Sequence, residues 1–91
     1  MKEHKYKIPE LLDEIEDKEL KENIQGAIMF KLRISVRTWY RKAFSKVGQN
    51  DSSHTFTIEE LETIAGVFNT RTKCVPILIP DDLITKTPTH V

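Results

Sequence analysis

The stretch ISVRTWYRKAF, residues 34–44, has the features of a short cationic helix. Ser35 is a residue type that caps helix N-termini, because its hydroxyl accepts a hydrogen bond from a backbone N–H of the first turn. Apolar side chains then recur at helical spacing and predict the side that faces the core: Val36, Trp39, Tyr40, Ala43 and Val47. The opposite side is predicted to be polar and cationic: Arg37, Thr38, Arg41, Lys42 and Ser45.

Two segments before this stretch also show helical spacing. In residues 8–17, Pro9 suits the first turn of a helix, where its missing N–H is not needed. In residues 17–34, aliphatic side chains recur at steps of three and four residues, and Asp17 is placed to cap the N-terminus. Gly26 lies inside this second pattern, and we expect it to mark the close approach of a neighbouring helix.

A fourth helical pattern covers residues 57–69. Thr57 and Glu60 have the spacing of a capping box, in which each side chain bonds to the backbone of the other residue. Apolar residues predict the buried face of this helix: Ile58, Leu61, Ile64, Ala65 and Phe68. Asn69 can adopt the left-handed conformation that ends many helices. The four segments together predict an all-α fold, a bundle of about four helices around one core.

The last part of the chain, residues 71–91, lacks a helical pattern. Pro76 and Pro80 flank its aliphatic residues, and proline is excluded from central strands because it has no N–H to donate. The sequence therefore predicts an extended arm or an edge strand, followed by a mobile tail from residue 81 onward. We accordingly divide the chain into a helical domain, residues 1–70, and a C-terminal arm or tail.

Charge is distributed unevenly, although the net charge is zero. Residues 8–22 contain seven acids and two lysines, whereas residues 23–50 contain six bases and no acid. This asymmetry favours a polyanionic partner for the basic face. The alternative is a pair of oppositely charged faces that contact only solvent.

The sequence contains no pattern that indicates an enzyme. His4, His54 and His90 are scattered and have no second ligand at metal-binding spacing, so we expect neither a metal nor another cofactor. The single cysteine, Cys74, excludes an intrachain disulfide and favours a reducing compartment. Because no apolar run approaches the length needed to span a membrane, we expect a cytoplasmic protein.

Two motifs in this order resemble the lambda-repressor-like family, the phage Cro and XRE-type regulators. IMFKLRISVRTWYRKAF, residues 28–44, is similar to the family's helix-turn-helix, and FTIEELETIAGVFN, residues 56–69, looks like the helix that packs behind it. The resemblance covers residues 18–70. The chain departs from the family at Arg33, where the turn usually has glycine, and at Lys42, where an apolar residue is common.

The resemblance implies a DNA-binding transcriptional regulator, a repressor of phage or prophage type, whose second motif helix reads the major groove with residues 35–46. The candidates for base contacts are Ser35, Arg37, Thr38 and Arg41. The candidates for phosphate contacts are Lys31, Arg33, Tyr40, Lys42 and Lys46. Two alternatives stay open for the aromatic residues: Tyr40 can reach a phosphate or belong to the core, and for Trp39 the core is the favoured place.

A single helix-turn-helix reads few base pairs, so the resemblance also implies a homodimer that reads two half-sites. The expected dimer contact is made by the aliphatic residues of the arm: Val75, Ile77, Leu78 and Ile79. Alternatively, these side chains fold back onto the core of their own chain and cap the first helix. Two other functions are compatible with the same helical fold, a protein–protein interaction module and an antitoxin-type component that represses its own operon.

Overall fold

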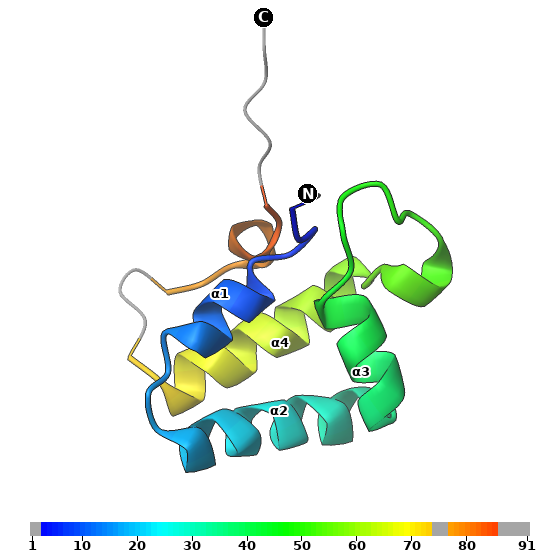
Figure 1. The fold of residues 1–91 in the computed structure, drawn as a ribbon. Helices are drawn as coiled ribbons and strands as arrows, with labels where there is room; N and C mark the ends of the chain where they lie inside the picture. Colours follow the sequence, from blue (N-terminus) through cyan, green and yellow to red (C-terminus); the bar gives the residue numbers. More distant parts are fainter. Residues whose placement is uncertain (1–2, 74–76, 86–91) are drawn as a thin grey trace, which may run out of the picture.

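The computed structural model describes residues 3–73 and 77–85 and confirms an all-α fold of four helices (Figure 1). Two short 3-10 helices, η1 and η2, accompany the α-helices. In chain order the elements are α1 (Ile8–Asp13), α2 (Lys18–Leu32), α3 (Val36–Ala43), η1 (Ser52–His54), α4 (Ile58–Arg71) and η2 (Pro80–Leu83). The long helices α2 and α4 lie side by side and run in opposite directions, while α3 stands at the C-terminal end of α2.

The predicted helix starts are confirmed by the capping bonds. The Asp17 carboxylate accepts hydrogen bonds from the backbone N–H groups of Glu19 and Leu20, at 2.9 and 3.2 Å. At the start of α4, the Thr57 N–H donates to the Glu60 carboxylate at 2.8 Å, and the Glu60 N–H donates to the Thr57 hydroxyl at 3.1 Å. These bonds satisfy backbone donors that a helix leaves free in its first turn.

The join between α2 and α3 is a tight turn, even though glycine is absent from it. Arg33 adopts the left-handed conformation, with φ 56° and ψ 47°. Its N–H donates to the carbonyl of Phe30 at 3.3 Å, and the N–H of Ile34 donates to that of Met29 at 3.1 Å, the bond pattern of a Schellman motif. Ser35 then caps α3 by accepting from the Thr38 N–H at 3.2 Å. The turn costs some backbone strain at Arg33, about 1–2 kcal/mol relative to glycine.

One core lies between the helices, and α3 enters it with two side chains, Trp39 and Ala43, both fully buried. The predicted apolar side of α3 was wrong for Val36, Tyr40 and Val47, which are 57%, 48% and 38% exposed. The helix is shorter than predicted and ends at Ala43, so Val47 lies beyond its last turn. For the same reason Ser45, predicted on the polar side, is buried after the helix and donates to the Lys42 carbonyl at 2.8 Å.

Other predicted details were also wrong. The first helix ends at Asp13, and Gly26 faces open space, since a Cβ atom added there would meet nothing within 4 Å. Ile58, expected in the buried face of α4, is 56% exposed because it occupies the first position of the helix. Asn69 does not end α4, which continues to Arg71.

The C-terminal residues 81–85 are part of the fold, so the prediction of a mobile tail was wrong for them. Leu83 is fully buried in the core. Its carbonyl accepts from the Lys7 N–H at 2.7 Å, and the Thr85 N–H donates to the Lys5 carbonyl at 3.0 Å. On its other side, the N-terminal segment pairs with residues 45–47, where the Lys5 N–H donates to the Ser45 carbonyl at 2.8 Å. Residues 3–7 therefore join two segments that are far apart in the sequence, residues 45–47 and residues 83–85.

The aliphatic arm divides into inward and outward side chains. The Asn69 amide donates to the carbonyl of Leu78 and accepts from its N–H, both at 2.8 Å, as a neighbouring strand would. This pair of bonds fixes the backbone so that Leu78 packs against the core, while Ile77 and Ile79 are 70% and 54% exposed. Leu78 thus follows the fold-back alternative, and Val75 lies outside the described residues.

Candidate nucleic-acid interface

The outward side of α3 carries the predicted base-reading residues. Ser35, Arg37 and Arg41 are exposed, and Thr38 is half-buried. The Ser35 hydroxyl donates to the Thr38 hydroxyl at 3.1 Å while it accepts from the Thr38 N–H. Both hydroxyls therefore take part in capping the helix, and the two arginines are the side chains on this face that extend freely into solvent.

The inward side of α3 holds the helix against α2. Trp39 is fully buried, and its indole N–H donates to the Gln25 side chain of α2 at 2.8 Å. Its ring also lies against Phe56, with 5.9 Å between the ring centroids. These contacts fix the orientation of α3, so its arginines are presented by a rigid element. Trp39 is placed in the core and not at the surface.

The basic residues of this region have few acidic partners. Within residues 3–73 and 77–85, two acid–base pairs lie within ion-pair distance, Lys42–Glu60 at 3.8 Å and His54–Asp51 at 2.6 Å. Arg33, Arg37, Arg41 and Lys46 are all exposed and make no such pair with a described residue. Their charges are available to an external anion.

Lys42 is placed differently from the other predicted phosphate contacts. Its ammonium faces Glu60 at the start of α4 and lies 5.7 Å from the centroid of the Phe56 ring, and the side chain is only 15% exposed. The aliphatic stem thus fills a position where an apolar residue would pack, and the charged end meets an acid at the margin of the core. This explains how a lysine fits there, and we leave it out of the proposed interface.

Lys31 and Tyr40 also have specific surroundings. Lys31 is exposed and lines two shallow hollows beside α4, together with Gly66 and Thr70 in one and Phe30 and Arg71 in the other. It forms no ion pair with a described acid, and its phosphate contact stays a prediction. Tyr40 is half-exposed and packs on Phe44, with 5.4 Å between the ring centroids.

Two residues that sequence reasoning missed, His4 and Phe44, extend this surface beyond the end of α3. The His4 ring meets Phe44 edge-on at 5.9 Å, and its Nε2 atom lies 3.1 Å from the ammonium of Lys46. An isolated antiparallel bridge joins the backbones of His4 and Lys46. No local pattern could have indicated this contact, because the two residues are separated by 42 positions in the chain.

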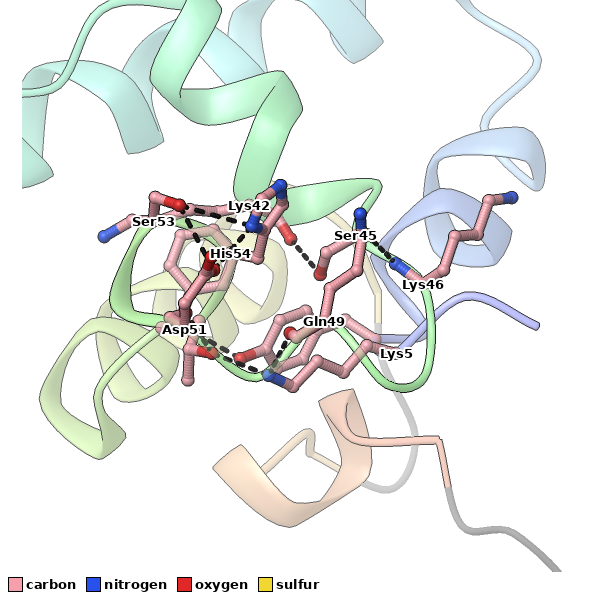
Figure 2. A network of polar contacts seen from close by, with 11 residues as sticks. Lys5, Lys42, Ser45, Lys46, Gln49, Asp51, Ser53 and His54 are labelled. Carbon is pink, nitrogen blue, oxygen red and sulfur yellow. Dashed lines mark hydrogen bonds and ion pairs between the residues drawn. The ribbon is translucent and has the colours of Figure 1, made fainter. Parts of the chain in front are cut away.

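A polar network supports the loop that follows α3 (Figure 2). The Lys5 ammonium donates to the Gln49 carbonyl at 3.1 Å and to the Thr55 hydroxyl at 2.6 Å. At η1, hydrogen bonds from His54 and Ser53 hold the pKa of the Asp51 carboxyl below its usual range. The network ties this loop to the N-terminal segment and so supports the position of Lys46.

The Asp51, Ser53 and His54 side chains do not form a nucleophile relay. In a Ser-His-Asp triad the serine and the aspartate bond to opposite nitrogens of the imidazole. Here both Ser53 and Asp51 contact Nδ1, at 3.2 and 2.6 Å. We interpret the cluster as side-chain hydrogen bonds that brace η1 against the residue before it. Across residues 3–73 and 77–85, no three His, Cys, Asp or Glu side chains are grouped as a metal site would require.

No family model, no curated protein and no solved structure matches the chain. The resemblance to the lambda-repressor-like family therefore stays a prediction that rests on the motif residues. None of the helices in the described part of the chain is long and apolar enough to cross a membrane.

Proposed function

We propose that the chain is a sequence-specific DNA-binding regulator of the helix-turn-helix type, acting in the cytoplasm as a repressor. The observation that carries the proposal is the outward face of α3, where Arg37 and Arg41 are exposed without an acidic partner among the described residues. The helix that presents them follows α2 after a three-residue turn and is anchored by Trp39. Helix-turn-helix proteins place such a second helix in the major groove.

The roles within the interface follow from side-chain chemistry. Arginine presents paired donors that fit the O6 and N7 atoms of guanine, so we assign base contacts to Arg37 and Arg41. Ser35 and Thr38 are within the same helix start and can contact a base or a phosphate through their hydroxyls. Arg33, at the turn, and Lys46, beyond the helix, are assigned to phosphates, which position the protein without reading sequence. Lys42 is left out because it faces Glu60.

Selection of bound sites from random duplexes, followed by fluorescence anisotropy, tests this proposal. Arg37→Ala and Arg41→Ala are expected to weaken the selected site by about 1–3 kcal/mol each and to relax base preference at one position. Arg33→Ala is expected to weaken selected and random duplexes alike, because phosphate contacts are independent of sequence. Lys18→Ala, at the far end of α2, is the matched control and should leave affinity close to wild type.

Two results would contradict the proposal. One is a wild-type chain that binds no duplex, or binds with an affinity independent of salt, since each neutralised phosphate contributes a slope of about −0.9 in log K against log salt. The other is an Arg37→Ala, Arg41→Ala double variant that selects the same sites with the same affinity. Binding of a protein partner to this face in place of DNA would favour the interaction-module alternative.

We also propose that the regulator is a homodimer formed through Ile77 and Ile79. The proposal is supported by their exposure, 70% and 54%, and by the Asn69 clamp on Leu78 that holds the backbone between them. The double variant Ile77→Ser, Ile79→Ser is expected to sediment as a folded monomer and to lose affinity for a palindromic site. A wild-type chain that is monomeric at high concentration would contradict it. Phe30→Ser, at an even more exposed apolar residue of α2, is the control and should stay dimeric.

A further inference from the structure

The contact between His4 and Lys46 brings two basic side chains together outside α3. Their backbones are paired by an antiparallel bridge, and the Val47 N–H donates to the Glu3 carbonyl at 2.8 Å. The imidazole Nε2 and the lysine Nζ lie 3.1 Å apart, and the ring is held edge-on against Phe44. The pair is therefore positioned by the fold, through the N-terminal segment on one side and the chain after α3 on the other.

The surroundings of the pair contain little negative charge. Neither side chain forms an ion pair with any residue of the described chain, where the acid–base pairs are Lys42–Glu60 and His54–Asp51. The charged neighbours in the chain are Glu3 and Lys5, and the Lys5 ammonium is turned toward the Gln49 carbonyl and the Thr55 hydroxyl. A lysine that donates to an imidazole instead of a carboxylate has most of its charge uncompensated.

We propose that His4 and Lys46 together bind one phosphate group of the DNA backbone, just beyond the C-terminal end of α3, with uptake of a proton at His4. In the free protein, the ammonium can donate to the unprotonated Nε2. When a phosphate oxygen is placed against the pair, both nitrogens can donate to it, provided that Nε2 carries a proton. Hydrogen bonds between charged donors and a phosphate are stronger than neutral ones, which favours the protonated imidazole in the complex.

This inference rests on the proposed DNA binding, and it adds a contact from the N-terminal segment to those from α3. The connection between the two surfaces is a row of three rings in contact, one pair tilted and one edge-on. Tyr40 of α3 packs on Phe44, and Phe44 packs on His4, with 5.4 and 5.9 Å between successive ring centroids. A DNA backbone that passes the exposed side of α3 at Tyr40 can therefore continue past Phe44 to the His4–Lys46 pair.

The test measures DNA affinity by fluorescence anisotropy as a function of salt and pH, with the full chain and a selected duplex. Lys46→Gln is expected to make the slope of log K against log salt less negative by about 0.9. Wild type is expected to bind the duplex more tightly at about pH 6 than at about pH 8, because histidine ordinarily changes its charge in this range and the complex takes up a proton at His4. His4→Gln is expected to remove this gain. The controls Lys18→Gln and His54→Gln should behave as wild type in the salt and pH series respectively.

The outcomes separate this inference from the function on which it rests. If wild type binds no duplex, the proposed function fails. If wild type binds and the Arg37 and Arg41 variants behave as expected, but His4→Gln keeps the pH dependence, only the inference is overturned. A Lys46→Gln variant that keeps the full salt slope overturns the inference and also the phosphate contact assigned to Lys46 in the proposed function. Inorganic phosphate at millimolar concentration should leave the difference between wild type and His4→Gln intact; its disappearance would indicate a site for free phosphate and overturn the assignment to DNA. Circular dichroism of each variant checks that it is folded.

Discussion

The two faces of α3 differ in what they contact, although they belong to a helix of only eight residues. On the inner face, Trp39 and Ala43 are fully buried, and the Trp39 indole bonds to Gln25. On the outer face, Arg37 and Arg41 are exposed and have no acidic partner among the described residues. The fold thus buries Trp39 and Ala43 to hold the helix and leaves Arg37 and Arg41 available, so stability and binding should respond to different substitutions.

Trp39→Ala tests the inner face and should have the largest effect. Removing a fully buried tryptophan leaves a cavity and an unpaired Gln25, so we expect the free energy of unfolding to fall by about 3–5 kcal/mol. Tyr40→Ala, one residue along on the outer face, should cost about 1 kcal/mol or less, because its ring is already half-exposed. Urea unfolding followed by circular dichroism measures both. Equal losses for the two variants would contradict the division into faces.

Leu83→Ala tests whether a buried side chain of the C-terminal segment contributes more to stability than an exposed one. Leu83 is fully buried against α4, whereas Ile79 is 54% exposed, so their truncation to alanine should differ in cost. We expect about 2–4 kcal/mol for Leu83→Ala and under 1 kcal/mol for Ile79→Ala, measured by urea unfolding at a protein concentration low enough that the chain is monomeric. A negligible loss for Leu83→Ala would indicate that residues 80–85 form a detachable tail.

The elements that the sequence predicted well are those with local signals. The capping box of Thr57 and Glu60 and the cap at Asp17 depend on residues two or three positions apart, and these signals located the starts of α4 and α2. Too many residues were predicted to lie on the buried side of α3, because a pattern of apolar residues does not show where a helix ends. Once α3 stops at Ala43, Val47 and Ser45 exchange their predicted environments.

The features that the sequence could not indicate depend on distant contacts. The Asn69 side chain bonds to Leu78, nine residues away, and the Lys7 N–H bonds to the Leu83 carbonyl across the length of the chain. The same holds for the candidate site. The basic residues of α3 were visible in the sequence, but the turn of Lys42 toward Glu60 and the approach of His4 to Lys46 follow from the folded arrangement.

The buried Tyr6 phenol allows the packing of the core to be tested through the pH dependence of the free energy of unfolding. Its ring is buried and its hydroxyl oxygen accepts from the Phe56 N–H at 2.8 Å. Burial raises the pKa of the Tyr6 phenol, with a smaller contribution from the charge of Glu60, while the Phe56 bond acts in the opposite direction. A raised pKa in the folded state means that stability is fully present below about pH 10 and falls as the pH rises above it.

We therefore expect the free energy of unfolding of wild type to decline above about pH 10 more steeply than that of Tyr6→Phe. At neutral pH the variant should lose about 1–2 kcal/mol, because the buried Phe56 N–H loses its acceptor. Urea unfolding between about pH 7 and 11 gives both quantities. Tyr40→Phe is the control, and parallel pH curves for wild type and Tyr6→Phe would show that the phenol does not titrate differently on folding.

The smallest expected change in stability belongs to the outer face itself. Arg37→Ala and Arg41→Ala remove exposed side chains that pair with no described acid, so each should alter the free energy of unfolding by no more than about 0.5 kcal/mol. Removing positive charge from a segment that holds six bases and no acid can even stabilise the fold slightly, because like charges repel. Urea unfolding of the double variant at low and high salt measures this, since screening should reduce any gain. A loss of about 2 kcal/mol or more would be as large as the loss caused by truncating a buried side chain. It would mean that the arginines hold α3 in place and that the outer face is not free for DNA.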